Sequence, residues 1–206
     1  MIGYDEMVSM LRGAVDQINR HHETLSQLDS FGGDGDHGTT MVRAMKCLEK
    51  AIAEDDSREL KGLLHGVGWA IMGVDGGATG PLLGTLFMSM SDAAPAAAAD
   101  APALAAMFEA GLAGVRRQTK AQVGDKTVLD ALVPAVGALR SAADAGSDIP
   151  EALRQAAEAA LQGAVSTKQL QARYGRARSL NEKSIGAQDP GATSISFIFR
   201  GFAEGV

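Results

Sequence analysis

Hydrophobic residues recur at every third or fourth position along most of the chain, which is the pattern of amphipathic helices. In the first segment the apolar residues Met7, Met10, Leu11, Val15 and Ile18 keep this spacing between charged residues, so the sequence predicts a helix over residues 5–27. The same periodicity, with a capping residue or proline at the expected start, predicts further helices. These are one from a Thr39 or Thr40 cap to about Glu54, one over residues 57–72 with a serine cap, one capped by Thr79 with Pro81 in its first turn, one from Pro102 to Lys120, one in the run from Val128 to Leu139, one from Pro150 to about Val165, and one opened by Asp189 and Pro190.

Two stretches are less regular. Pro134 lies inside a periodic run, where a proline is expected to kink a helix or to mark a ragged first turn. The stretch SISFIF (194–199) contains residues that favour strands, so a strand competes with a helix there. No other run favours a strand. The sequence therefore predicts an all-α fold, a bundle or barrel of about eight helices.

Composition narrows the class of protein further. The chain has 206 residues, of which 46% are hydrophobic and 4% aromatic, and no linker divides it, so we expect one domain over residues 1–206. The net charge of −6 argues against nucleic acid or an anionic membrane as a partner. One cysteine, Cys47, no recognisable signal peptide and no apolar run of about 20 residues together predict a cytoplasmic protein.

Several of the predicted helices follow glycine-rich loops, at residues 32–38, 73–77, 124 and 186–191. A helix N-terminus offers free N–H groups and a partial positive charge, and glycine lets an anion approach the backbone closely. Taken singly, each loop is better explained by the ending of one helix and the start of the next. Several such helix starts in one place would bind a polyphosphate.

The first loop carries most of the candidate chemistry. Asp29, Asp34 and Asp36 would repel each other unless a cation lies between them, and oxygen ligands on short side chains suit Mg²⁺. The alternative is an acidic, solvated turn whose aspartates cap helices. His37 is a candidate hydrogen-bond donor to a phosphate, or else an exposed loop histidine. The basic cluster of Arg173, Arg176 and Arg178 is a solvated face, or it supplies a guanidinium to a transferring phosphoryl group.

Four motifs occur together in one order: GDGDHGTTM (33–41), GGATGPLLGT (76–85), GDKTVLDAL (124–132) and QARYGRARSLNEKSIGAQDPGATS (171–194). In these motifs the chain closely resembles the nucleotide-binding L subunit, or L domain, of dihydroxyacetone kinases. The resemblance spans nearly the whole chain. It implies an antiparallel barrel of eight helices that binds ATP or ADP at one end through two Mg²⁺ ions.

The resemblance also implies a role for individual residues. Asp29, Asp34 and Asp36 would be the magnesium ligands, and Arg176 and His37 the catalytic residues. The expected nucleotide contacts are His37, Gly38, Thr39, Thr40, Ala78 and Thr79 at the phosphates, Val128 at the base, Arg176 near the phosphates, and Asp189, Pro190 and Gly191 along the other side of the nucleotide. Thr119 stands where some relatives have glycine, and Thr40 where relatives often have asparagine.

In this family the sugar is bound covalently by a histidine of a separate K subunit or domain, so the implied partner is a K subunit. The phosphate donor is left open. It is either ATP as a dissociable substrate or bound ADP that a phosphotransferase-system M subunit rephosphorylates. The acceptor is dihydroxyacetone or a related small keto-sugar. The alternative is a regulatory module that senses nucleotide and binds a transcription factor. A degenerate member that binds nothing is disfavoured, because the three aspartates and Arg176 are all present.

Overall fold

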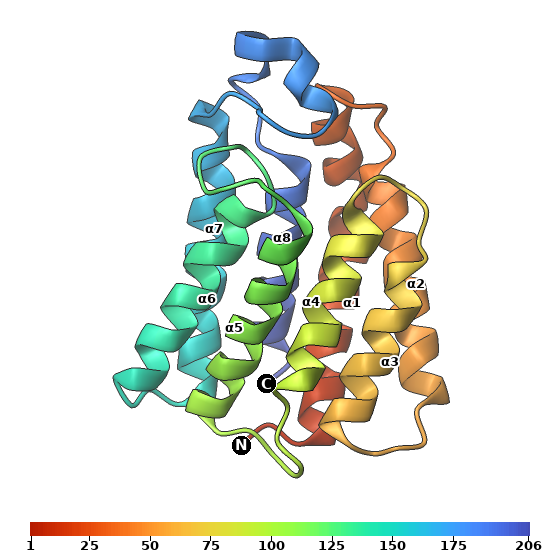
Figure 1. Cartoon of the computed structure of the whole chain (residues 1–206), viewed down its shortest axis with the longest axis vertical. Helices are drawn as coiled ribbons and strands as arrows, with labels where there is room; N and C mark the ends of the chain where they lie inside the picture. Colours follow the sequence, from red (N-terminus) through yellow and green to blue (C-terminus); the bar gives the residue numbers. More distant parts are fainter.

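Eight α helices and two short 3-10 helices make up the protein, in a computed structural model that describes residues 1–206 (Figure 1). Their bounds are α1 (Tyr4–Ser30), α2 (His37–Glu54), α3 (Leu60–Met72), α4 (Thr79–Asp92), α5 (Ala101–Gln118), α6 (Leu129–Asp144), α7 (Ile149–Ser166), η1 (Thr167–Gln169), η2 (Arg176–Ser184) and α8 (Pro190–Glu204). None of the helices combines the length and the apolar composition that crossing a bilayer requires.

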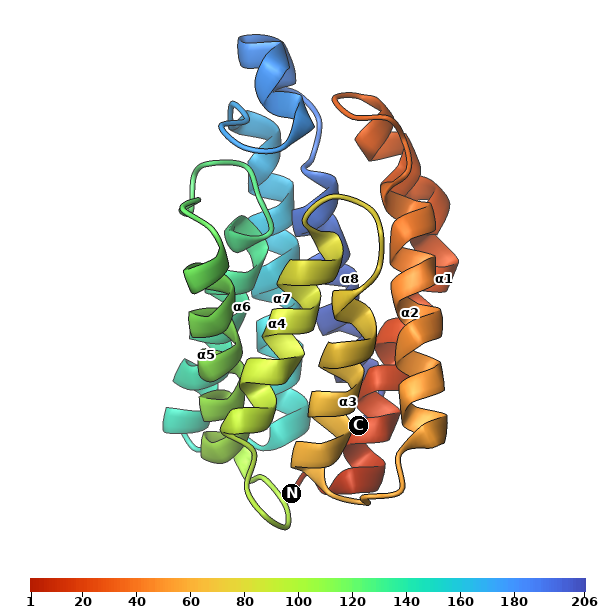
Figure 2. The same cartoon turned by 45° about the vertical axis from the view of Figure 1, so that its right-hand side comes forward.

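The α helices run up and down in turn and form a closed ring. Each helix packs against the next one along the chain, and α8 returns to pack against α1 (Figures 1 and 2). The buried apolar faces meet in one hydrophobic cluster inside this ring, which includes the mutually packed rings of Phe108, Phe199 and Phe202. The predicted all-α antiparallel barrel of about eight helices is confirmed.

Close contact between neighbouring helices depends on glycine. A Cβ atom on Gly201 of α8 would lie 2.4 Å from backbone atoms of Gly13 in α1, and a Cβ on Gly84 of α4 would lie 2.8 Å from the carbonyl oxygen of Gly68 in α3. These pairs let the backbones approach more closely than side chains would allow, because glycine has no Cβ. The frequent glycine of this sequence therefore serves the barrel wall as well as its loops.

Three of the predicted helix starts are wrong. The second helix is not capped by Thr39 or Thr40 but begins at His37, because the Asp29 carboxylate accepts hydrogen bonds from the Asp36 and His37 N–H groups just before it. The third begins at Leu60, not at Ser57, whose hydroxyl group instead bonds Asp55 within the preceding turn. Thr79 is not a cap but the first residue of α4, although Pro81 does lie in the first turn as predicted.

The helix starts marked by an aspartate followed by proline are confirmed to within two residues. Asp100, Asp148 and Asp189 each accept a hydrogen bond from a backbone N–H in the first turn of α5, α7 and α8. The SISFIF stretch lies inside α8, so no strand forms there. Pro134 lies within α6, which continues through it. The missing N–H leaves the Asp130 carbonyl without its helical donor, and Gly163 of α7 packs against that carbonyl.

Candidate functional site

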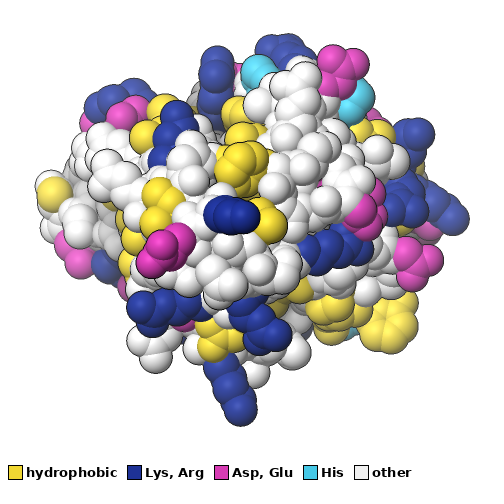
Figure 3. Space-filling model, turned by 90° about the horizontal axis from the view of Figure 1, so that it is seen from above, with side chains coloured by type: hydrophobic (Ala, Val, Ile, Leu, Met, Phe, Trp, Pro, Cys, Tyr) yellow, Lys and Arg dark blue, Asp and Glu magenta, His cyan; other side chains and the backbone are white.

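One end of the barrel collects the loops that precede α2, α4, α6 and α8 (Figures 1 and 2). Between them lies a cleft of about 350 Å³. Figure 3 looks onto this end, where Lys and Arg side chains are spread over the face among apolar and uncharged atoms. The cleft is lined by most of the predicted site residues: Asp29, Asp36, His37, Ala78, Thr79, Val128, Arg176, Asp189, Pro190 and Gly191. Asp34, Gly38, Thr39 and Thr40 are not among its lining residues.

The three aspartates of the first loop converge. One carboxylate oxygen of each can be chosen so that all three lie within 4.8 Å of one another. Asp29 is held in place because its Oδ2 accepts from the N–H groups of Asp36, at 3.1 Å, and His37, at 3.4 Å. Gly33 packs directly on this carboxylate, since a Cβ there would lie 2.3 Å from Asp29 Oδ1. Capping therefore accounts for Asp29 in part, but not for Asp34 or Asp36.

Arg176 is the cation that faces this cluster. Its Nη1 pairs with Asp34 and lies 3.6 Å from Asp36 Oδ1, although 142 residues separate Arg176 from Asp34 in the sequence. The arginine comes from residues 171–183, hereafter the strap, which Figure 1 shows as the blue segment above α7 and α8. Of the predicted basic cluster, Arg173 lies 3.7 Å from Asp125, and Arg178 is exposed.

The acidic cluster has the chemistry of a magnesium site. Its donors are hard carboxylate oxygens on short side chains, grouped closely enough to share one cation and open to the cleft on one side. Such a site leaves room for water and for the oxygens of a phosphate, which is how proteins usually hold Mg²⁺. The residues present therefore fit the group that the sequence predicts.

Two helix N-termini point free N–H groups toward the same end. The amides of Gly38 and Thr39 in the first turn of α2 have no hydrogen-bond acceptor in the protein, and neither have those of Thr79 and Gly80 in α4. Position 38 also requires glycine for packing, because a Cβ there would lie 1.9 Å from the His22 carbonyl oxygen of α1. Unpaired N–H groups at a helix start are what an anion binds.

Thr40 is turned away from the cleft. Its side chain is buried, and its hydroxyl accepts a hydrogen bond from Arg43 Nη2 at 3.0 Å. Arg43 also donates to the Asp75 carbonyl, and a Cβ on Gly76 would lie 2.5 Å from Thr40. Thr40 and Arg43 thus fix the loop before α4 against α2, which aligns the two helix starts.

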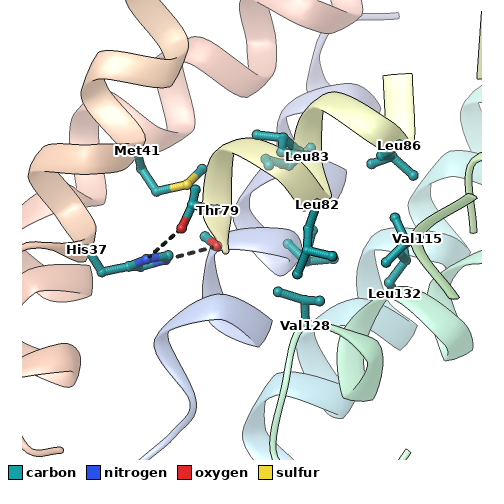
Figure 4. Close-up of a pocket in the computed structure, with 12 residues that line it drawn as sticks. His37, Met41, Thr79, Leu82, Leu83, Leu86, Val115, Val128 and Leu132 are labelled. Carbon is teal, nitrogen blue, oxygen red and sulfur yellow. Dashed lines mark hydrogen bonds between the residues drawn. The ribbon is translucent and has the colours of Figure 1, made fainter. Parts of the chain in front are cut away.

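His37 stands between three helices at the floor of the cleft (Figure 4). Its Nε2 lies 3.3 Å from the Ser194 hydroxyl of α8 and its Nδ1 lies 3.5 Å from the Thr79 hydroxyl of α4. Burial lowers the pKa of His37, and this effect outweighs the carboxylates of Asp29 and Asp36, which raise the pKa. Below the His37 imidazole lies a narrow apolar pocket of about 30 Å³, with Leu82, Leu83 and Leu132 in its wall. His37 therefore separates the polar cleft from the apolar interior.

The opposite wall of the cleft is formed by Val128 and the start of α8. Gly191 packs on Val128, because a Cβ on it would lie 2.9 Å from Val128 Cγ1. Asp189 caps α8 through Ala192 N–H at 2.7 Å. Burial, with a smaller contribution from Asp130, raises the pKa of Asp189 to about 7. Thr119, where the sequence departs from some relatives, lines the cleft as well.

The sequence analysis missed the residues that hold the loop before α6. Asp130 accepts from the N–H groups of Gly124 and Thr127, and Asp125 accepts from Gln122 N–H. Lys126 lines the cleft but is only 5% exposed. The signal was present in the GDKTVLD motif, where three charged residues occur within six positions of an otherwise apolar stretch.

The fold and this cleft define a class of protein: an antiparallel helical barrel with one charged site at the end where its even-numbered helices begin. The chain belongs to the DAK2 domain family, whose model matches residues 32–204. The resemblance to the L subunits of dihydroxyacetone kinases is confirmed.

Three similar proteins illustrate the relationship. The ADP-binding subunit DhaL of the PEP-dependent dihydroxyacetone kinase of Escherichia coli is 39% identical over 95% of this chain and 93% of its own length. The L-erythrulose 1-kinase of Mycolicibacterium smegmatis is 37% identical over 87% of this chain and 32% of its own. The structure of the C. freundii dihydroxyacetone kinase with AMP-PNP and Mg²⁺ has a TM-score of 0.73 and 25% identity, over 95% of this chain. The chain spans about a third of that kinase.

Proposed function

We propose that this chain is the nucleotide- and magnesium-binding subunit of a dihydroxyacetone-type kinase, and that it acts as one domain over residues 1–206. The observation that carries the proposal is that the acidic cluster, two helix starts with free N–H groups and Arg176 lie together at the end of the barrel that holds the cleft. A polyphosphate with its metal needs this combination of groups, and a cap or a surface turn does not.

Asp29, Asp34 and Asp36 would hold Mg²⁺. The family resemblance implies that two Mg²⁺ ions bind there. When bound, the metal neutralises the charge of the phosphate oxygens and fixes their position. The chain's own groups do the remaining work. The N–H groups at the starts of α2 and α4, with Ala78 and Thr79 beside them, bind phosphate oxygens. Gly38 and Thr39 would contribute through their free N–H groups. Thr40 would support that turn, since its N–H donates to the Asp36 carbonyl and its hydroxyl accepts from Arg43.

Arg176 is the residue proposed to stabilise the transferring phosphoryl group. Its side chain is 54% exposed and faces the acidic cluster from a segment outside the barrel, so it can reach an oxygen that the barrel residues do not. His37, whose pKa is lowered by burial, is the second proposed catalytic residue, with a ring fixed between Thr79 and Ser194. In such transfers positioning and charge neutralisation account for most of the catalysis.

The rest of the nucleotide would lie along the wall that Val128 forms together with Asp189, Pro190 and Gly191. These residues line the same cleft as the acidic cluster, on its far wall. Val128 supplies an apolar surface for the base, and Gly191 packs behind it on Val128 Cγ1.

For the donor, we propose ADP as a bound cofactor that a phosphotransferase-system M subunit recharges. The support is the E. coli relative, which this chain covers almost entirely and which is named an ADP-binding subunit of a PEP-dependent kinase. The acceptor would be held by a separate K subunit, and it is dihydroxyacetone or a related keto-sugar, since an L-erythrulose kinase is also among the relatives.

The test is reconstitution with a K subunit. The protein, the K subunit and Mg²⁺ are mixed with dihydroxyacetone or L-erythrulose, and sugar phosphate is measured with ATP alone and with a phosphoenolpyruvate-fed phosphotransferase system. Transfer with the second donor supports the proposal, while transfer with ATP alone assigns the dissociable-substrate mechanism. Nucleotide-dependent binding to a transcription factor, with no transfer under either condition, would instead support the regulatory alternative.

A further inference from the structure

Lys126 is the only buried Lys or Arg side chain of the protein. It belongs to the loop before α6 and adopts a left-handed backbone conformation with φ of 61°, which a residue with a side chain rarely takes. Backbone strain of this kind persists where the surrounding contacts enforce it. Its ammonium group has no carboxylate within ion-pair distance, so the contacts that hold the Lys126 side chain are not ion pairs.

Those contacts are four backbone carbonyl groups. Lys126 Nζ donates to the oxygens of Thr167 at 2.8 Å, Leu170 at 3.2 Å, Ser184 at 2.7 Å and Ala187 at 2.6 Å. An ammonium group has three N–H bonds, so all three are used and one is shared. Burial lowers the pKa of Lys126, and the nearby carboxylates of Asp189 and Asp130 act against that effect.

The four carbonyls lie in two pairs along the chain, one on each side of the strap. Thr167 and Leu170 come just before the strap, and Ser184 and Ala187 come just after residue 183, where the strap ends. One side chain therefore joins both ends of the strap at a single point. Three other bonds help it there. Gly186 N–H donates to the Lys168 carbonyl at 2.8 Å, Ala172 N–H donates to the Ser184 hydroxyl at 2.9 Å, and Asp189 N–H donates to the Thr167 hydroxyl at 2.8 Å.

The strap itself is weakly attached to the barrel. Most of its residues are exposed, and it lies outside the ring of helices (Figure 1). Beyond its base, it meets the rest of the protein through Arg173, whose N–H donates to the Asp125 carbonyl and whose guanidinium lies 3.7 Å from the Asp125 carboxylate. It also packs Ala177 and Leu180 on Gly32, and it places Arg176 on Asp34 and Asp36. The place of Arg176 over the acidic loop thus depends on where the base of the strap is fixed.

We propose that Lys126 is a positioning residue for phosphoryl transfer, an internal cation that closes the base of the strap and so holds Arg176 over the acidic cluster. Lys126 itself does not act on the phosphate, because its three N–H bonds are already engaged with the protein. Its catalytic effect rests on the proposed function, but the closing of the strap does not, and the two can be measured separately.

The first measurement is hydrogen exchange of the strap amides without any nucleotide or metal. Lys126→Met keeps the length of the side chain and removes the donors, and exchange over residues 171–183 should become about tenfold faster while the barrel helices keep their protection. Lys120→Met is the matched control, since it removes an exposed lysine of the same loop and should change nothing. Unchanged strap exchange in Lys126→Met, or faster exchange throughout the barrel, overturns the proposal.

The second measurement tests the link to Arg176. In the reconstituted kinase, Lys126→Met should lower kcat about tenfold with ADP affinity nearly unchanged, and it should lower kcat far less when Arg176→Ala is already present. Equal kcat losses in both backgrounds would show that Lys126 does not act through Arg176. Should the methionine variant fail to fold, Lys126→Gln keeps two donors and must show the same effects at smaller size. If the wild type itself neither binds nucleotide nor transfers phosphate, the proposed function fails, and the exchange data still decide whether Lys126 closes the strap.

Discussion

Arg176 Nη1 lies 3.6 Å from Asp36 Oδ1, so a residue of the strap directly faces a carboxylate of the acidic loop. The two residues are far apart in the sequence, and both line the cleft. Their pairing connects the proposed metal site with the one arginine that can approach a phosphate from outside the barrel. The account of function depends on this connection.

Replacing Arg176 by alanine should therefore depress phosphoryl transfer more than nucleotide binding. We expect kcat to fall by about 100-fold or more, because charge neutralisation is worth most in the transition state, while the Kd for Mg-ADP changes by less than about tenfold. Steady-state kinetics with a K subunit and calorimetry measure the two quantities. Arg178→Ala removes the same charge two residues away and should leave both nearly unchanged. Equal losses in kcat and affinity would show that Arg176 binds the ground state.

Replacing Asp34 by alanine should abolish tight Mg-ADP binding without unfolding the barrel. The exposed Asp34 carboxylate caps no helix, so the fold does not need it, whereas the metal would lose a ligand. We expect the Kd to rise by about 100-fold or more, equivalent to about 2.7 kcal/mol. Calorimetry measures the affinity and circular dichroism the fold. Asp56→Ala, an equal charge change in the exposed turn between α2 and α3, is the control. Wild-type affinity in Asp34→Ala would refute the metal assignment.

Gly38 gives a test of the barrel beneath the site. Gly38→Ala should lower the free energy of unfolding by about 2 kcal/mol or more, because the new Cβ would meet the His22 carbonyl oxygen at 1.9 Å and push α2 away from α1. Gly66→Ala in α3 is the matched control, since nothing lies within 4 Å of its Cβ, and it should be neutral or stabilising. Urea unfolding measures both. Equal stability of the two variants would mean that α1 and α2 adjust freely.

Asp189 makes the stability of the nucleotide-free protein depend on pH. Its pKa is raised from 3.8 to about 7 by burial, so between these values the folded protein keeps a proton that the unfolded chain has lost. The contribution of this group to the free energy of unfolding is therefore greatest at low pH and falls as pH rises through this window, by at most about 4 kcal/mol. Asp189→Asn keeps the capping oxygen and should remove this fall. Urea unfolding at pH 5 and pH 8, in chelator, compares the variant with wild type, and parallel pH dependence in the two would contradict the assignment.

Much of this architecture was predictable because it depends on local signals. Hydrophobic spacing identified the helices, and Pro102, Pro150 and the Asp189-Pro190 pair located three helix starts, since these signals act within one turn. The start of α2 was misplaced because its cap comes from Asp29, seven residues before Asp36 and across a loop. A contact of that kind depends on how the chain folds back, which spacing alone does not reveal.

The site residues also divide into those with a local signal in the sequence and those whose partners are distant along the chain. The acidic loop was evident in the sequence because three carboxylates stand close together in it. Lys126 was not, because its partners are backbone carbonyls 41 to 61 residues away and leave no trace in residue type. Thr40 differs from both. Its motif predicts a phosphate contact, whereas its buried hydroxyl accepts a hydrogen bond from Arg43.

The measurement that tests the central claim most directly is the nucleotide content of the protein purified in the presence of Mg²⁺. The protein is denatured, and the released nucleotide is resolved by anion-exchange chromatography and compared with protein concentration. The account predicts one ADP per chain, lost after dialysis against EDTA and restored by ADP only when Mg²⁺ is supplied. A protein that carries no nucleotide and binds none when Mg-ADP is added would contradict the account.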